Sequence, residues 1–141
     1  MQHVVNSDLT ADLNRLAPFL AKVQLNALIE LLQGEESSFF ADAVSALSET
    51  VRRMPKTYEQ EPLGDQATVH LHYFLNGCDW YIIEKDKLGN GTKQAFGLAQ
   101  LGLGYAELGY ININEITQVG AELDLHWRPV TLAQVRQSLT S

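Results

Sequence analysis

Asn76-Gly77-Cys78-Asp79-Trp80-Tyr81-Ile82-Ile83-Glu84-Lys85-Asp86 is the stretch that decides the fold, because it joins a tight-turn dipeptide to the most strand-like run in the chain. Asn-Gly tolerates the positive φ angles of a two-residue hairpin turn, so a reversal is predicted at residues 76–77. Residues 80–83 are bulky and apolar or aromatic at every position, which is typical of a strand buried on both faces. We therefore expect an interior strand that sets the register of a sheet.

The segments on either side of this stretch predict the other strands. Residues 68–75 alternate between apolar and more polar side chains, and this period of two is typical of a half-buried strand. That strand is the expected antiparallel partner of 80–83 across the turn. Three further strands are predicted at 94–101, 106–111 and 123–127.

Residues 1–54 predict helices. Leu9, Leu13 and Leu16 lie on one face of a first helix, and Pro18 should interrupt it because proline lacks an amide hydrogen. A second helix is predicted from Pro18 to Gly34. A third carries a narrow apolar seam from Phe40 to Met54, and the expected product is an antiparallel helical hairpin. Two short helices with capping-box spacing are predicted near the C-terminus, at 112–120 and 131–139.

These elements together predict an α+β fold, in which an N-terminal helical hairpin packs with an antiparallel meander of four to five strands plus short C-terminal helices. Residues 1–54 form the helical region, 55–66 a connector with two prolines, and 67–141 the α+β region. Each half has an apolar face that the other can cover, so we expect one compact unit. The alternative for the Phe40–Met54 seam is homodimerisation.

Composition and charge narrow the function classes. The chain has 141 residues, 45% of them hydrophobic, which is ordinary globular composition. Its one cysteine excludes an intrachain disulfide, and no apolar run approaches the length of a membrane span, so the expected location is the cytoplasm. A net charge of −7 disfavours nucleic-acid binding and favours a basic protein partner, although it could serve solubility alone.

His70 and His72 form the candidate metal site. Two histidines two apart on one strand share a face, a spacing that can place two imidazoles on one zinc ion. A third ligand would have to come from His126, Cys78 or an acid on the neighbouring strand. The alternative is that both histidines lie on the more polar face of the sheet.

The acidic residues do not have the spacing of a known catalytic motif. Glu84 is followed directly by Lys85, so the two side chains point to opposite faces of a strand, unlike the acid and lysine of a metal-dependent nuclease. Gly102-Leu103-Gly104 leads into a strand and has Glu107 in place of the third glycine of a dinucleotide-binding loop. We predict no catalytic residue and no cofactor.

Acidic and aromatic residues in the sheet half instead predict a docking surface. Aromatic side chains contribute large contact areas to interfaces, and neighbouring carboxylates would attract a cationic partner. The alternative is that core packing buries the aromatic rings. The candidate partner-binding residues are Asp79, Glu84, Glu107, Tyr105 and Tyr110.

Four ordered blocks of sequence resemble a known protein family. They are Asp79-Trp80-Tyr81, Ala95-Phe96-Gly97-Leu98, Glu107-Leu108-Gly109-Tyr110-Ile111, and Glu122-Leu123-Asp124-Leu125-His126-Trp127 followed by Pro129 and Thr131-Leu132. The chain is similar over about 66–141 to the domain-of-unknown-function 2958 family of bacterial plasmids, phages and integrative elements. The resemblance implies a soluble cytoplasmic accessory protein of a mobile element, and it carries over no catalytic residue.

Two functions are therefore expected, from different classes. The first is a non-enzymatic acidic interaction protein of a mobile genetic element that binds a protein partner, with counter-defence as one version. The alternative is a small metal-binding protein or metal-dependent enzyme that uses His70 and His72.

Overall fold

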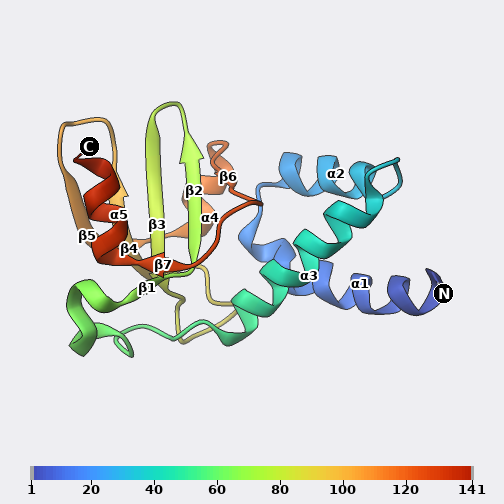
Figure 1. The fold of residues 1–141 in the computed structure, drawn as a ribbon, viewed down its shortest axis with the longest axis horizontal. Helices are drawn as coiled ribbons and strands as arrows, with labels where there is room; N and C mark the ends of the chain where they lie inside the picture. Colours follow the sequence, from blue (N-terminus) through green and yellow to red (C-terminus); the bar gives the residue numbers. More distant parts are fainter. Residues whose placement is uncertain (1, 141) are drawn as a thin grey trace.

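The computed structural model describes the backbone of residues 2–140 and the side chains of residues 8–140. Three helices and a short 3₁₀ turn come first, and a second 3₁₀ segment, the seven strands and two shorter helices follow (Figure 1). The helical elements are α1 (Gln2–Leu16), η1 (Ala17–Phe19), α2 (Lys22–Leu31), α3 (Ser37–Arg53), η2 (Glu61–Gln66), α4 (Ile113–Gln118) and α5 (Leu132–Leu139). Among the described residues, no helix is long and apolar enough to cross a membrane.

Five strands form one antiparallel sheet in the order β5-β4-β3-β2-β6, so β3 is its central strand, as predicted. A second, two-stranded sheet pairs β1 with β7. The α+β fold with terminal helices is therefore confirmed. The strands are β1 (Thr68–Val69), β2 (Leu71–Leu75), β3 (Cys78–Glu84), β4 (Ala95–Gln100), β5 (Ala106–Ile111), β6 (Glu122–Leu123) and β7 (Val130–Thr131).

The predicted hairpin at residues 76–77 is present. Asn76 has φ 47° and Gly77 has φ 83°, and the strands on either side pair from Leu75 and Cys78 outward. Positive φ at both central residues is what a type I′ turn requires, and Asn-Gly adopts it at little steric cost. The local sequence therefore fixes the register of β2 against β3.

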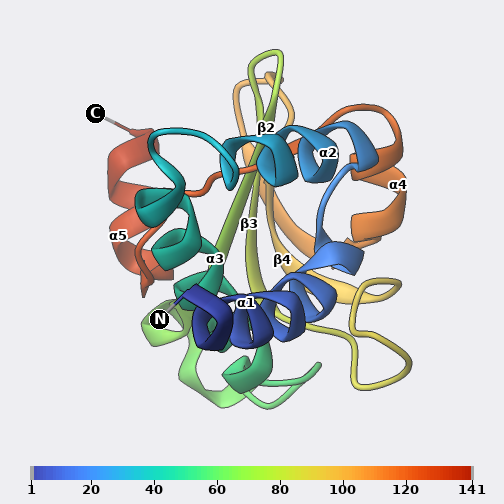
Figure 2. The ribbon, with the colours of Figure 1, turned by 90° about the vertical axis from the view of Figure 1, so that its right-hand side faces the viewer.

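Helices cover both faces of the sheet. Figure 2 shows α1, α2 and α3 in front of the strands, and their apolar side chains share a core with Leu71, Tyr73 and Ile82. On the opposite face, Leu132 and Val135 of α5 pack in a second cluster with strand side chains that include Tyr81 and Leu98. Burial of both faces explains why β3 is apolar at successive positions.

The apolar seam of α3 belongs to the core of the monomer. Val44, Leu47, Val51 and Met54 are all buried in the larger cluster, and α3 packs mainly against α1. A homodimer through the Phe40–Met54 helix would therefore have to use another face of α3, since the seam is already covered.

Two predicted boundaries were wrong. The second helix begins at Lys22 rather than Pro18, because Pro18 lies in η1 and Ala21 has extended backbone angles. The predicted strand 123–127 ends after Leu123. Its continuation is replaced by a turn, because the Asp124 side chain accepts a hydrogen bond from the backbone N–H of His126 at 2.9 Å.

The alternation predicted for residues 68–75 also breaks, at His70. Val69 packs in the cluster beneath α5, whereas Leu71 packs against the N-terminal helices. In a regular strand, residues two apart would lie on the same face. The break separates β1 from β2, so the premise that His70 and His72 share one face of a continuous strand was wrong.

Candidate functional site

A cavity of about 330 Å³ lies where the connector, the end of β3, the edge of the sheet and α5 meet. Its walls are mainly apolar, but several acidic and amide side chains reach it. We call it the Glu84 pocket. It is lined by Tyr58, Gln60, Glu61, Gly64, Asp65, Ala67, Ile83, Glu84, Phe96, Leu108 and Leu132.

A β-bulge directs Glu84 into this pocket. Ile82 pairs with Gly97 and Glu84 pairs with Phe96, so Ile83 is an extra residue in β3. A bulge of this kind re-aims the side chains that follow it. Glu84 consequently lies beside Phe96 on the α5 face of the sheet, and it is only 3% exposed.

The Glu84 carboxylate accepts two short hydrogen bonds from the connector backbone. Its Oε1 accepts from the N–H of Tyr58 at 2.7 Å, and its Oε2 accepts from the N–H of Gln60 at 2.6 Å. Both are charge-assisted bonds. Among residues 8–140, no lysine, arginine or histidine lies within ion-pair distance of Glu84. A buried negative charge therefore borders the cavity without a counter-ion.

The segment predicted as a connector is fixed to the sheet. The Gln60 side chain donates to the carbonyls of Thr68 and Ile83, both at 3.0 Å, and accepts from the N–H of Thr68 at 3.0 Å. Tyr58 has φ 78°, a left-handed conformation that is uncommon outside glycine. Its cost is tolerated here because Glu84 and Gln60 hold the backbone on both sides.

Aromatic side chains form the rim of the pocket. Tyr58 is 53% exposed and Tyr110 is 50% exposed, and their rings meet edge to face with centroids 6.3 Å apart. Tyr110 also contacts the ring of Phe96 at 5.9 Å. Leu108 is on the same face of β5 and is also exposed. The rim is therefore an exposed apolar and aromatic surface beside a buried carboxylate.

The five predicted partner-binding residues do not form a single patch. Glu84 and Tyr110 come together at the pocket and its rim. Tyr105 lines a different cavity, at the β4–β5 turn, and Glu107 lies on the opposite face of β5 from Tyr110 because strand side chains alternate. Asp79 is bound internally to His72, with 2.7 Å between its Oδ1 and Nε2 of the ring.

His72 lies between two carboxylates. Its Nδ1 is 3.0 Å from Oδ2 of Asp124, so each ring nitrogen contacts one acid. Both contacts are hydrogen bonds together only when both nitrogens carry hydrogen, since ionised carboxylates only accept. The ring also stacks on Tyr81 at 4.8 Å and contacts Trp127 at 5.1 Å. This arrangement ties the β2–β3 hairpin to the C-terminal segment.

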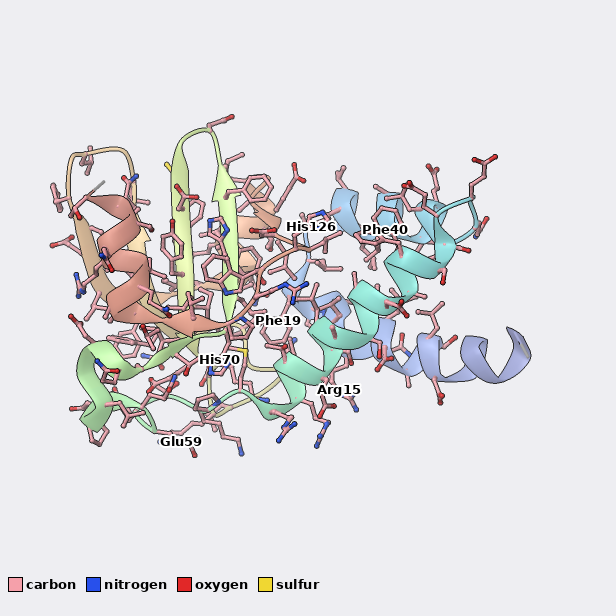
Figure 3. All side chains as sticks on the ribbon, in the orientation of Figure 1. Arg15, Phe19, Phe40, Glu59, His70 and His126 are labelled. Carbon is pink, nitrogen blue, oxygen red and sulfur yellow. The ribbon has the colours of Figure 1, made fainter. Side chains whose placement is uncertain are left out.

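His70 is in a different environment. Its Nε2 atom is buried and makes no hydrogen bond to another described residue, and burial lowers the pKa of the ring. The proposed third ligand His126 lies beside α3, with its ring 5.6 Å from that of Phe39, and Figure 3 shows it well separated from His70. Within residues 8–140, no three histidine, cysteine or acidic side chains are placed to hold a metal ion. The metal site remains a prediction.

Sequence reasoning did not identify Gln60 or Asp124 as organising residues. Gln60 lies in an aperiodic segment, and the three hydrogen bonds of its side chain are to backbone groups at least eight residues away. The Asp-Leu-His-Trp run around Asp124 does contain a turn-forming aspartate, which was a usable signal. The alternation of Leu123, Leu125 and Trp127 predicts a strand there instead.

A larger cavity, about 900 Å³, lies between α2 and α4. No buried charged side chain lines it, and much of its wall comes from residues 17–27. The Glu84 pocket is the stronger candidate because its carboxylate is desolvated and lacks a counter-ion.

Comparison of the chain with curated proteins found no match, and no solved structure matches it either. A protein-family model does match, over residues 43–138. The matched segment begins within α3 and ends within α5, and it contains the whole Glu84 pocket and the residues around His72. Since this segment is more than half of the sequence, the chain belongs to the family described as "Protein of unknown function (DUF2958)".

Proposed function

We propose that this protein is a non-enzymatic interaction protein that binds a partner protein at the Glu84 pocket and along strand β5. The observation that carries the proposal is the buried Glu84 carboxylate, which has no counter-ion among the described residues and lies in a cavity whose rim is exposed and aromatic. Apolar pockets with few, well-placed polar groups are typical binding sites. Exposed tyrosines beside such a pocket are typical anchors of protein interfaces.

Strand β5 supplies a second element of the surface. It is an edge strand, and its outward-facing backbone groups make no hydrogen bond to any other described residue. The opposite edge is protected, because the Gln24 side chain bonds both the N–H and the carbonyl of Leu123, each at 2.8 Å. An open edge can accept an extended peptide as an added strand.

The acidic net charge of −7 supports a basic partner. From the family resemblance, we further infer that the protein serves a bacterial plasmid, phage or integrative element in the cytoplasm, with counter-defence as one version of the role. The genes that neighbour it would test this part. Neighbours without any mobile-element function would count against it.

Selection of displayed peptides against the immobilised full chain tests the binding surface. We expect enriched peptides to bind the Tyr110→Ala variant at least about tenfold more weakly, as for an interface anchor. Tyr105→Ala is the matched control, since Tyr105 is equally exposed but lies away from the pocket, and it should bind normally. Binding should also weaken as salt increases. Failure to enrich any peptide, or equal binding by Tyr110→Ala, would refute the proposed surface.

Metal binding by His70 and His72 is the alternative function. One observation favours it, the buried Nε2 of His70 that lacks a hydrogen-bond partner among the described residues. Against it, both ring nitrogens of His72 contact carboxylates. Metal analysis of protein purified without a histidine tag decides between the two, and stoichiometric zinc that is lost in His70→Ala would establish the alternative.

A further inference from the structure

We infer that the Glu84 pocket receives one lysine or arginine side chain from the partner, with the cationic head group at the Glu84 carboxylate. This inference rests on the proposed function and specifies the chemistry of what is bound. It follows from the charge, the wall and the location of the pocket.

The Glu84 carboxylate at the pocket has no counter-ion among residues 8–140. Glu84 is 97% buried and its oxygens are bonded by two backbone N–H groups, which carry no net charge. Glu61 and Asp65 line the same cavity, and of these Asp65 already contacts Arg136 at 3.3 Å. A desolvated carboxylate without a counter-ion is unfavourable, so the entry of a cation is favoured. Each Glu84 oxygen has a lone pair left with which to accept from an incoming ammonium or guanidinium group.

The wall of the pocket suits the aliphatic part of such a side chain. Phe96, Leu108 and Leu132 provide apolar surface between the solvent and the carboxylate. Lysine and arginine bury their methylene groups along apolar surfaces while the charged end finds polar partners. The rings of Tyr58 and Tyr110 at the rim add faces for a cation–π contact during entry.

The size and position of the pocket fit a side chain presented by an extended peptide. A volume of about 330 Å³ is at the lower end for ligand sites, which suits one side chain better than a larger cofactor. Leu108 and Tyr110 belong to edge strand β5 (Figure 1). A peptide added along β5 would direct every second side chain to the face on which the pocket lies.

Nuclear magnetic resonance of the full chain tests this directly, because the amide protons of Tyr58 and Gln60 bond the carboxylate and report on it. The probes are N-acetyl-arginine methylamide and N-acetyl-lysine methylamide. Their neutral counterparts, the citrulline and norleucine derivatives, are the controls. We expect saturable shifts of both amide signals with dissociation constants on the order of millimolar, as for a single side chain, and at least fivefold weaker effects from the neutral probes.

Two variants localise the binding. Glu84→Gln should abolish the shifts, whereas Glu107→Gln, an exposed acid on the other face of β5, should leave them unchanged. Because Glu84→Gln could fail to fold, Leu108→Lys provides a second test. It places a cation at the pocket mouth and should block the probes, while Leu108→Met should still bind.

The outcomes separate this inference from the proposed function. No shifts up to about 50 mM probe, far above a millimolar dissociation constant, would overturn the inference. Equal shifts with charged and neutral probes would do the same. If displayed peptides still bind the wild type, bind Tyr110→Ala weakly and need no basic residue, the binding surface stands and only the cationic specificity fails. If Tyr110→Ala has no effect on those peptides, the proposed surface itself fails.

Discussion

Replacing Glu84 by alanine should destabilise the protein far more than replacing an exposed acidic residue of the same sheet. The substitution removes the acceptor of two backbone N–H groups, those of Tyr58 and Gln60, which lie 2.7 and 2.6 Å from its oxygens. A buried donor without an acceptor costs about 1–3 kcal/mol. Two such donors therefore imply a loss of about 2–6 kcal/mol in the free energy of unfolding.

Two effects place the expected value in the lower half of that range. The cavity is partly open to solvent, so water can reach the two amides after truncation. The substitution also removes a desolvated charge, and this offsets part of the loss in stability. We therefore expect a loss of about 2–4 kcal/mol. Tyr58 should be affected most, because its left-handed backbone, φ 78°, then lacks the bond that holds it.

Urea unfolding followed by the fluorescence of Trp80 and Trp127 measures this loss. With an m value of about 2 kcal/mol per M, a loss of 3 kcal/mol lowers the midpoint by about 1.5 M. Glu107→Ala is the matched control and should change stability by less than about 0.5 kcal/mol, since the Glu107 side chain is exposed and makes no hydrogen bond or ion pair with another described residue. Equal midpoints for the two variants would refute the structural role assigned to Glu84.

Three further predictions concern other parts of the fold. Gly97→Ala should destabilise the sheet by about 1–3 kcal/mol or prevent folding, because a Cβ at Gly97 would clash with the carbonyl oxygen of Tyr81. Urea unfolding tests this prediction, and a midpoint equal to that of the wild type would contradict it. His72→Ala and Asp124→Ala should show a coupling energy of about 1–2 kcal/mol in a double-mutant cycle, whereas additive losses would mean that their 3.0 Å contact contributes nothing. Burial lowers the pKa of His70, so below about pH 6.5 this histidine binds more protons in the unfolded chain than in the folded one, and stability should fall with decreasing pH. His70→Asn should reduce that fall. A pH profile of stability identical to that of the wild type would contradict the prediction.

Local sequence patterns predicted much of the fold because the interactions involved are local. Asn76-Gly77 specifies the hairpin through its backbone preferences alone. Thr131 and Gln134 form the predicted capping box, in which both bonds lie within one helical turn. The spacing of apolar residues in α3 predicted both the helix and its buried face. In each case the determining contacts are only a few residues apart.

The site could be predicted only in part. Glu84 and Tyr110 were both identified as candidate binding residues, but their common location depends on a bulge in β3 and on the pairing of β4 with β5. The metal site and the binding surface both remain predictions. The role of Gln60 had no local signal, since its side chain bonds backbone groups of β1 and β3.

The sequence by itself determined that this is an α+β chain with a central strand at 80–83, a hairpin at 76–77 and an acidic net charge. These properties follow from periodicity, turn chemistry and composition, which act over short distances. Only the tertiary structure decided that Glu84 is buried without a counter-ion and that Asp79 is bound to His72. Burial and charge pairing depend on which distant segments pack together, and spacing along the chain carries little information about that packing.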